Sequence, residues 1–245
     1  MSKLADKIRK VTRLQAQALG FGTARAAVEP TMVLAAEARD AAAAAELARK
    51  GADVVILGSA SSPVGAGSAK GLGDAIAGAW VAGTADNEAK ACKEAGFDFV
   101  VFDPDRAAAT ALLEENIGYV MVLPADLNEA ETRTLEAFQL DAIHVGTIGG
   151  PLTVRRQIDL RRLHAMTRKP LMASVRKDVS VPELQALRDT NVVVVLADSA
   201  DAVERLRTTI DALPPRSRRK ESEERPTPLV PQTAAAAEEE HDHDD

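Results

Sequence analysis

Residues 171–199 read LMASVRKDVSVPELQALRDTNVVVVLADS, and this stretch contains the pattern that decides the fold. An apolar run is followed by a polar turn, a segment with helical spacing, and a second apolar run that begins after Asn191. Both apolar runs are continuous rather than alternating, which is typical of parallel strands buried on both faces. Leu184 and Leu187 have the spacing of one helix face. The stretch therefore predicts a β-α-β unit.

The same unit recurs three times upstream, in residues 32–59, 79–105 and 119–147. The position of Asn191 is taken there by Asp53, Asp98 and Asp141, so that the four marker residues lie 45, 43 and 50 positions apart. Four units supply eight strands, each followed by a helix. The strands are predicted near 31–37, 53–58, 79–84, 98–103, 118–123, 141–146, 170–175 and 192–197.

Eight strands that alternate with helices predict an α/β fold, a closed eight-stranded parallel (β/α)8 barrel of the TIM type. An open doubly wound sheet is the alternative, and the even spacing of the units favours closure. The chain then has three parts: an N-terminal helix and lead-in in 1–30, the barrel in 31–214, and a tail in 215–245. The tail lacks aromatic residues and clusters like charges, so it is predicted to be disordered.

The composition argues against several classes of protein. A net charge of −7, with no basic stripe interleaved with aromatics, argues against nucleic-acid binding. No run of apolar residues is long enough to span a membrane. Cys92 is the only cysteine, which excludes an internal disulfide, and its helical surroundings predict a packed side chain. We therefore expect a soluble, cytoplasmic protein.

Residues 3–19 are predicted to form an amphipathic helix. Its apolar face carries Leu4, Ile8, Val11, Leu14 and Ala18, and its other face carries Lys3, Lys7, Arg9, Lys10 and Arg13. Such a helix either makes weak contact with an anionic membrane surface or covers the bottom or flank of the barrel. The second reading is favoured because the apolar face is narrow and has no Trp or Phe to anchor it in lipid.

Function in TIM barrels lies at the C-terminal ends of the strands, where the βα loops begin. Glu37, Asp103 and His144 lie at the ends of predicted strands and are candidates for proton transfer. Most other polar residues there are interpreted as helix caps, namely Asp40, Asp86, Asp105, Asp126, Ser180 and Ser199. A buried histidine in a strand is more often a hydrogen-bonded core residue than a catalyst, so both roles stay open for His144.

Two features of the rim predict a site for an anion. Arg176 and Lys177 follow the seventh strand, where such barrels often bind phosphate. Gly149 and Gly150 precede Pro151, which is predicted to occupy the first helical position and to leave free backbone N–H groups at a helix N-terminus. We expect the anion-binding and proton-transfer residues to converge on one pocket at the mouth of the barrel.

The second half of the chain, including residues 169–199, is similar in rhythm to the phosphate-binding barrels of the ribulose-phosphate-binding and FMN-linked families. The resemblance implies a phosphate site after strands seven and eight, where those families place glycines. Here these stretches read ASVRKDVS and VLADSADA, without glycine. The sequence contains no motif that identifies a cofactor, and its four histidines do not have the spacing of metal ligands.

Two functions remain open on this sequence. The first is a lyase or isomerase acting on a small anionic metabolite, with or without a phosphoryl group, with the ionisable residues of the rim as its machinery. The second is a non-catalytic barrel that serves as a ligand-binding or protein-interaction module. The ionisable rim favours the first, and the missing glycines favour the second. The oligomeric state stays undetermined.

Overall fold

The computed structural model describes residues 2–12, 30–63, 69, 71–83, 87–124, 127–197 and 199–216. Its strands are β1 (Val33–Ala38), β2 (Val54–Leu57), β3 (Ile76–Trp80), β4 (Phe99–Phe102), β5 (Gly118–Val122), β6 (Ala142–Ile148), β7 (Leu171–Val175) and β8 (Val192–Ala197). The helices are α1 (Lys3–Thr12), α2 (Ala41–Arg49), α3 (Glu88–Glu94), α4 (Glu129–Thr134), α5 (Val154–Thr167), α6 (Val181–Arg188) and α7 (Ala200–Asp211), with short 3-10 turns η1 (Ala109–Leu113) and η2 (Leu135–Ala137).

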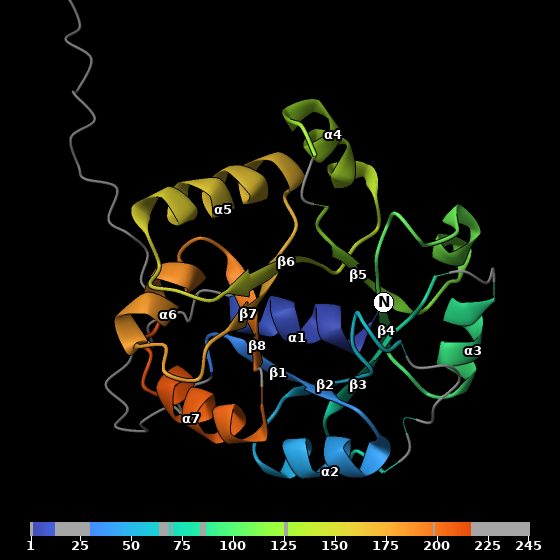
Figure 1. Ribbon diagram of the computed structural model, residues 1–245, viewed down its shortest axis with the longest axis horizontal. Helices are drawn as coiled ribbons and strands as arrows, with labels where there is room; N and C mark the ends of the chain where they lie inside the picture. The colour runs from blue at the N-terminus through green and yellow to red at the C-terminus, as the bar shows by residue number, and fades with distance from the viewer. Residues whose placement is uncertain are drawn as a thin grey trace, which may run out of the picture.

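The eight strands form a closed parallel barrel, which confirms the predicted fold. Each strand pairs in parallel with the next along the chain, and β8 pairs with β1 through Val194 and Val33 to close the ring. Figure 1 shows the helices surrounding this ring. None of the described helices is long and apolar enough to cross a membrane. Of the predicted disordered tail, residues 217–245 lie outside the described part of the chain.

Two details of the prediction are wrong. The third strand was expected in residues 79–84, but it begins at Ile76 and ends at Trp80. Gly78 hid its true start, because a strand position without a side chain breaks the apolar run; the ring of Phe99 fills that place and leaves no room for a Cβ. A helix was also expected after every strand. Residues 58–63 and 71–75, between β2 and β3, contain none, and only the 3-10 turn η1 follows β4.

Helix α1 closes the N-terminal end of the barrel, as one of the two readings predicted. Leu4, Ile8 and Val11 are buried and belong to the same apolar cluster as the inward-facing residues of the strands. The helix contacts β1, β5 and β8, and Figure 1 shows it lying across the centre of the ring. The described helix ends at Thr12, and residues 13–19 of the prediction lie outside the described residues.

The repeated aspartates hold this helix in place. Both carboxylate oxygens of Asp98 accept hydrogen bonds from the first turn of α1, from the backbone N–H groups of Lys3 (2.8 Å) and Leu4 (2.9 Å). Asp141 accepts a hydrogen bond from the Ser2 hydroxyl, and Asp53 forms an ion pair with Lys7 at 2.8 Å. Carboxylates at a helix N-terminus satisfy its free N–H groups and oppose its dipole. The repeated aspartates that predicted the strands are thus also the residues that contact the helix α1 region.

Candidate functional site

Trp80 and Glu37 meet at the C-terminal end of the barrel interior. Trp80 is the last residue of β3 and is 4% exposed, whereas Glu37, near the end of β1, is exposed to solvent. The indole Nε1 of Trp80 donates a hydrogen bond of 2.8 Å to Oε1 of Glu37. The carboxyl group is therefore held at the mouth by a buried and rigid donor.

His144 lies on the other side of the same tryptophan. The two rings pack edge to face, with their centroids 6.1 Å apart. Nε2 of His144 lies 3.2 Å from the hydroxyl oxygen of Ser174 on β7, and its Nδ1 is buried without a hydrogen-bond partner. Four strands, β1, β3, β6 and β7, thus contribute to one group of polar side chains, which we call the mouth cluster: Glu37, Trp80, His144 and Ser174.

Burial controls the protonation of the mouth cluster. Glu37 as a residue is exposed, but the protein atoms around its carboxyl group desolvate that group and raise its pKa above the ordinary value, and the hydrogen bond from Trp80 opposes this shift only in part. Desolvation also lowers the pKa of His144 to about 4, so the imidazole is neutral at pH 7. Nearby charges of opposite sign would favour the charged forms, but for both groups desolvation is the larger influence.

Asp103 lies at the same rim but is engaged within its own loop. It follows β4, and its Oδ1 accepts a hydrogen bond of 3.0 Å from the backbone N–H of Asp105. Within the described residues, no hydrogen bond or ion pair joins the Asp103 side chain to the mouth cluster. Asp103 is therefore near the expected site without being part of its hydrogen-bonded group.

Arg176 turns away from the mouth cluster toward α6. Its Nη2 donates to both carboxylate oxygens of Glu183, at 2.9 and 2.8 Å, and its Nε pairs with Asp178 at 2.9 Å. Its Nη1 donates to the carbonyl of Gly150 at 2.6 Å. Two carboxylates thus neutralise this guanidinium, and it ties the loop after β7 to the loop after β6.

The helix that was predicted to start beside Gly149 and Gly150 begins later in the structure. Helix α5 begins at Val154 with Thr153 as its N-cap, so the prediction that Pro151 occupies the first helical position is wrong. A left-handed glycine lies earlier, within β6: Gly146, with φ of 76°, at the register shift between His144 and Thr147. The Thr153 hydroxyl oxygen accepts a hydrogen bond from the backbone N–H of Arg156, so Thr153 caps this helix, a role that was not predicted from the sequence.

Glu183 occupies this region as an internal anion. Its carboxylate accepts hydrogen bonds from the backbone and hydroxyl of Ser180, from Arg176, and from the backbone N–H of Leu152 at 3.4 Å. These donors lower the pKa of Glu183 to about 2. Arg176, one of the groups that were expected to bind a ligand's anion, therefore already binds a carboxylate of the protein itself.

Lys177 is the other cation of the predicted site. It is exposed, and it forms no hydrogen bond or ion pair in the part of the chain that the structure describes. A free ammonium group beside the mouth remains able to attract an anion, although screening by solvent weakens its pull.

The predicted helix caps have mixed outcomes. Asp40 and Ser199 accept hydrogen bonds from the N–H groups of Ala43 and Ala202, and Ser180 is the N-cap of α6. Asp105 precedes no helix directly, because η1 starts after Ala108. Asp86 and Asp126 lie outside the described residues, and the N-caps of α3 and α4 are Asn87 and Asn128.

Sequence reasoning missed Trp80 and Glu183 as members of this region. Trp80 was placed near the start of a strand because β3 was predicted three residues too late, whereas it stands at the C-terminal end. Its being the only tryptophan of the chain, two positions after Gly78, was the available signal. Glu183 was readable as the third residue after Ser180, the spacing of a capping box.

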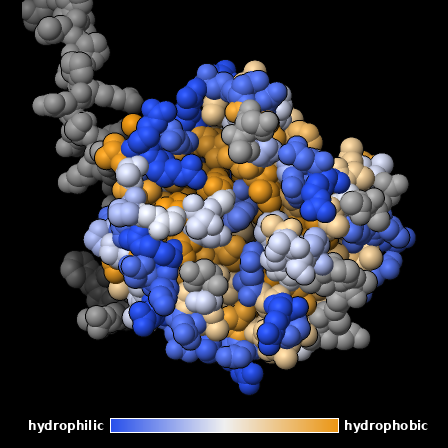
Figure 2. Space-filling view, in the orientation of Figure 1, coloured by the Kyte–Doolittle hydropathy of each residue, from blue (hydrophilic) through white to orange (hydrophobic). Residues whose placement is uncertain are grey.

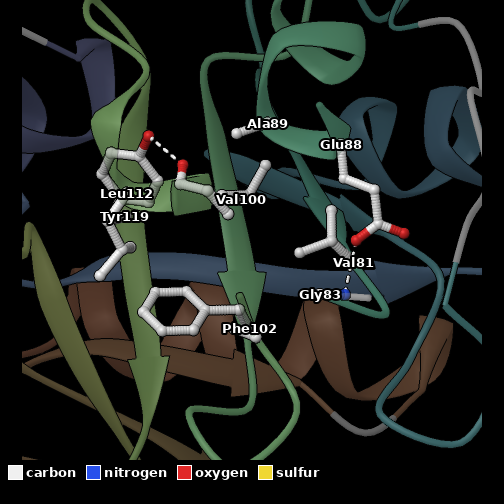
Figure 3. A pocket seen from close by; sticks show the side chains of 10 residues that line it. Val81, Gly83, Glu88, Ala89, Val100, Phe102, Leu112 and Tyr119 are labelled. Carbon is white, nitrogen blue, oxygen red and sulfur yellow. Dashed lines mark hydrogen bonds between the residues drawn. The ribbon is translucent and has the colours of Figure 1, made fainter. Parts of the chain in front are cut away.

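A separate hollow lies outside the barrel wall, between β3, β4 and β5 and the segments α3 and η1 (Figure 3). Val81, Val100, Phe102 and Tyr119 line it, and it has room for about one water molecule. This hollow is a packing gap.

Cys92 is buried, and desolvation raises the pKa of its thiol to about 11. The packed cysteine that we predicted therefore does not form a reactive thiolate. The described residues contain no group of three or more His, Cys, Asp and Glu side chains placed to share a metal.

Comparison with known proteins relates the chain to others by fold. No model of a protein family matches the sequence, and no curated protein does. Among solved structures, 3-keto-L-gulonate-6-phosphate decarboxylase from Vibrio cholerae aligns with a TM-score of 0.55 and 14% identity, over 76% of this chain and 100% of its own.

Two further structures align over similar lengths. Ligand-free tryptophan synthase from M. tuberculosis gives a TM-score of 0.57 at 12% identity, over 86% of this chain and 98% of its own. Homocysteine methyltransferase MmuM from Escherichia coli gives 0.52 at 12% identity, over 73% and 95%.

The chain has a TIM-barrel fold. The similarity extends to barrels whose names include a phosphorylated substrate, in line with the resemblance seen in the sequence. Identities this low show the fold alone, and one fold serves many reactions. The feature of this chain that bears on its function is therefore the mouth cluster.

Proposed function

We propose that this chain binds a small anionic, phosphorylated metabolite at the C-terminal mouth of its barrel and acts on it as a lyase or isomerase. The observation that carries the proposal is the mouth cluster, in which Glu37 and His144 approach Trp80 from two sides. Ionisable groups with shifted pKa values at the mouth of a barrel are the usual basis for acid–base chemistry.

In this proposal Glu37 transfers the proton. Its raised pKa brings the carboxylate closer to the pH at which a general base is most effective. The carboxylate takes a proton from the carbon next to a carbonyl group. The electron pair of that C–H bond forms a C=C double bond, and the π pair of the carbonyl group moves onto its oxygen to give an enolate. The carboxylic acid then returns the proton to a neighbouring atom. Neutral His144 and Ser174 line the polar wall beside it, Asp103 is the alternative base at the rim, and Lys177 attracts the anionic group of the metabolite.

The test is exchange of substrate hydrogen with solvent deuterium. Phosphorylated keto and aldo sugars are incubated with the protein in D2O, and the C–H signal next to the carbonyl is followed by proton NMR. We expect exchange with the native chain and a loss of about 100-fold or more in Glu37→Gln. Glu46→Gln on α2 is the matched control, since Glu46 is exposed and pairs with Lys50 away from the mouth. Absence of exchange for every compound with the native chain would refute the enzyme.

A second function is favoured by one observation, the neutralisation of Arg176 by Glu183 and Asp178. An arginine at the rim that is already paired with carboxylates of the protein is not available to bind a substrate anion. This favours a non-catalytic ligand-binding or protein-interaction module. A thermal-shift screen separates the two, because a ligand at about 100 times its Kd adds about 2.7 kcal/mol of stability whether or not it reacts. Stabilisation without exchange supports the module. Loss of that stabilisation in Lys177→Ala but not in Lys90→Ala, an exposed lysine on α3, places the ligand at the mouth.

A further inference from the structure

Two arginines lie together at the end of the barrel opposite the mouth. Arg188 is the last residue of α6 and is only 3% exposed. Its Nη1 donates to the hydroxyl of Thr31, which precedes β1, at 3.1 Å, and to the carbonyl of Pro214, which follows α7. Arg188 thus joins the beginning and the end of the barrel, and it brings its charge beside the segment that contains Arg216.

Several N–H groups of this pair lack a partner. Nε of Arg188 and both Nε and Nη2 of Arg216 are buried without a hydrogen-bond acceptor. The carboxylate that pairs with Arg188 is Asp189, which lies at 3.5 Å from Nε and is half exposed. Burial, followed by the positive charge of Arg188, lowers the pKa of Arg216. One partly solvated carboxylate therefore faces two cations.

Such an arrangement is costly unless something compensates it. A buried charge needs a counter-charge, and buried N–H groups in native proteins are nearly always satisfied by protein, water or an ion. Among the described residues, no other acidic side chain is paired with Arg188 or Arg216. An anion with several acceptor oxygens is the kind of group that would satisfy these donors.

We propose that Arg188, Arg216 and Thr31 form a binding site for a phosphate-type oxyanion at the N-terminal end of the barrel. Guanidinium groups bind phosphate oxygens through parallel N–H donors, and two of them match the charge of a dianion. Nε and Nη2 of Arg216 have no acceptor, and Nε of Arg188 has only the long ion pair with Asp189, so these nitrogens are the donors that we assign to the ion. Arg216 as a whole is partly exposed whereas its Nε and Nη2 are buried, so in this proposal the anion enters on its side when that side chain shifts. This site is separate from the mouth cluster and does not depend on the function proposed there.

The experiment follows the arginine Nε–H signals by NMR in the full chain during titration with inorganic phosphate. We expect the signals of Arg188 and Arg216 to shift together and saturably, while that of exposed Arg49 on α2 does not move. Arg216→Gln should raise the phosphate Kd at this site by about tenfold or more, and Arg49→Gln should leave it unchanged. Arg216 comes after the last helix, so its variant should fold even if Arg188→Gln does not.

Three results would overturn the site: no shift at millimolar phosphate, equal shifts for Arg49, or an unchanged Kd in Arg216→Gln. A fourth result would also overturn it: the Nε–H signals of Arg188 and Arg216 shift when residues 226–245 are deleted but not when phosphate is added. Acidic residues of the chain itself would then supply the anion. Sugar phosphates compared with inorganic phosphate then distinguish an attached phosphoryl group from the free ion. Glu37→Gln should leave the titration unchanged, so failure here is separate from failure at the mouth.

Discussion

The neutral histidine of the mouth cluster predicts a specific loss of stability in acid. His144 is 8% exposed, and burial lowers its pKa from 6.5 to about 4. Between these two values the unfolded chain binds a proton at this side chain and the folded chain does not. Because the unfolded state then binds more protons, stability falls as the pH falls. Above the unfolded value of 6.5 the histidine has no such effect.

The size of the loss follows from the shift. One pKa unit corresponds to about 1.4 kcal/mol, so His144 should remove about 2 kcal/mol of unfolding free energy by pH 5 and about 3 kcal/mol by pH 4. These values are comparable with a large part of the stability of an ordinary domain. The carboxyl groups of the protein titrate in the same window, so the contribution of His144 must be isolated with a variant.

The assay is urea unfolding at about pH 7.5, 5 and 4, with the native chain and with His144→Gln. Glutamine cannot take up a proton, but it keeps a polar group within reach of Ser174. We expect the native chain to lose about 2 kcal/mol more than the variant by pH 5. Parallel losses in the two proteins would show that His144 is solvated or protonated in the folded state. That result would refute the account of the mouth as a desolvated site.

Three further predictions test the fold. Leu4→Ala should lower the free energy of unfolding by about 2–5 kcal/mol in chemical denaturation, since this side chain of α1 is fully buried at the barrel end. Val154→Ala, at an exposed position, should change it by no more than about 0.5 kcal/mol. Equal effects would mean that the helix is not docked. Gly78→Ala should lower the unfolding free energy by about 1–3 kcal/mol because its Cβ meets the Phe99 ring, and Phe99→Leu in the same chain should recover part of the loss. Deletion of residues 217–245 should leave the melting temperature within a few degrees, and a larger shift would show that the tail is docked.

The mouth cluster was only partly predictable, for reasons of register. Glu37 and His144 were found because they lie at the ends of predicted strands, where TIM barrels carry their functional groups. Trp80 was not, because a glycine within β3 concealed where the strand begins. Arg176 was assigned to anion binding, but its partners Glu183 and Asp178 come from the following loop and helix, and the sequence does not show how that helix orients them.

The sequence by itself determined the (β/α)8 barrel, because a fourfold repeat of strand and helix periodicities is local information. It also determined that α1 has one apolar face. Only the tertiary structure decided where that face docks and which charges meet across the barrel. Asp98 and Lys3 are 95 positions apart, and Thr31 and Arg188 are 157 apart. Such contacts depend on how the ring closes, and closure sets the burial that shifts the pKa values of Glu37 and His144.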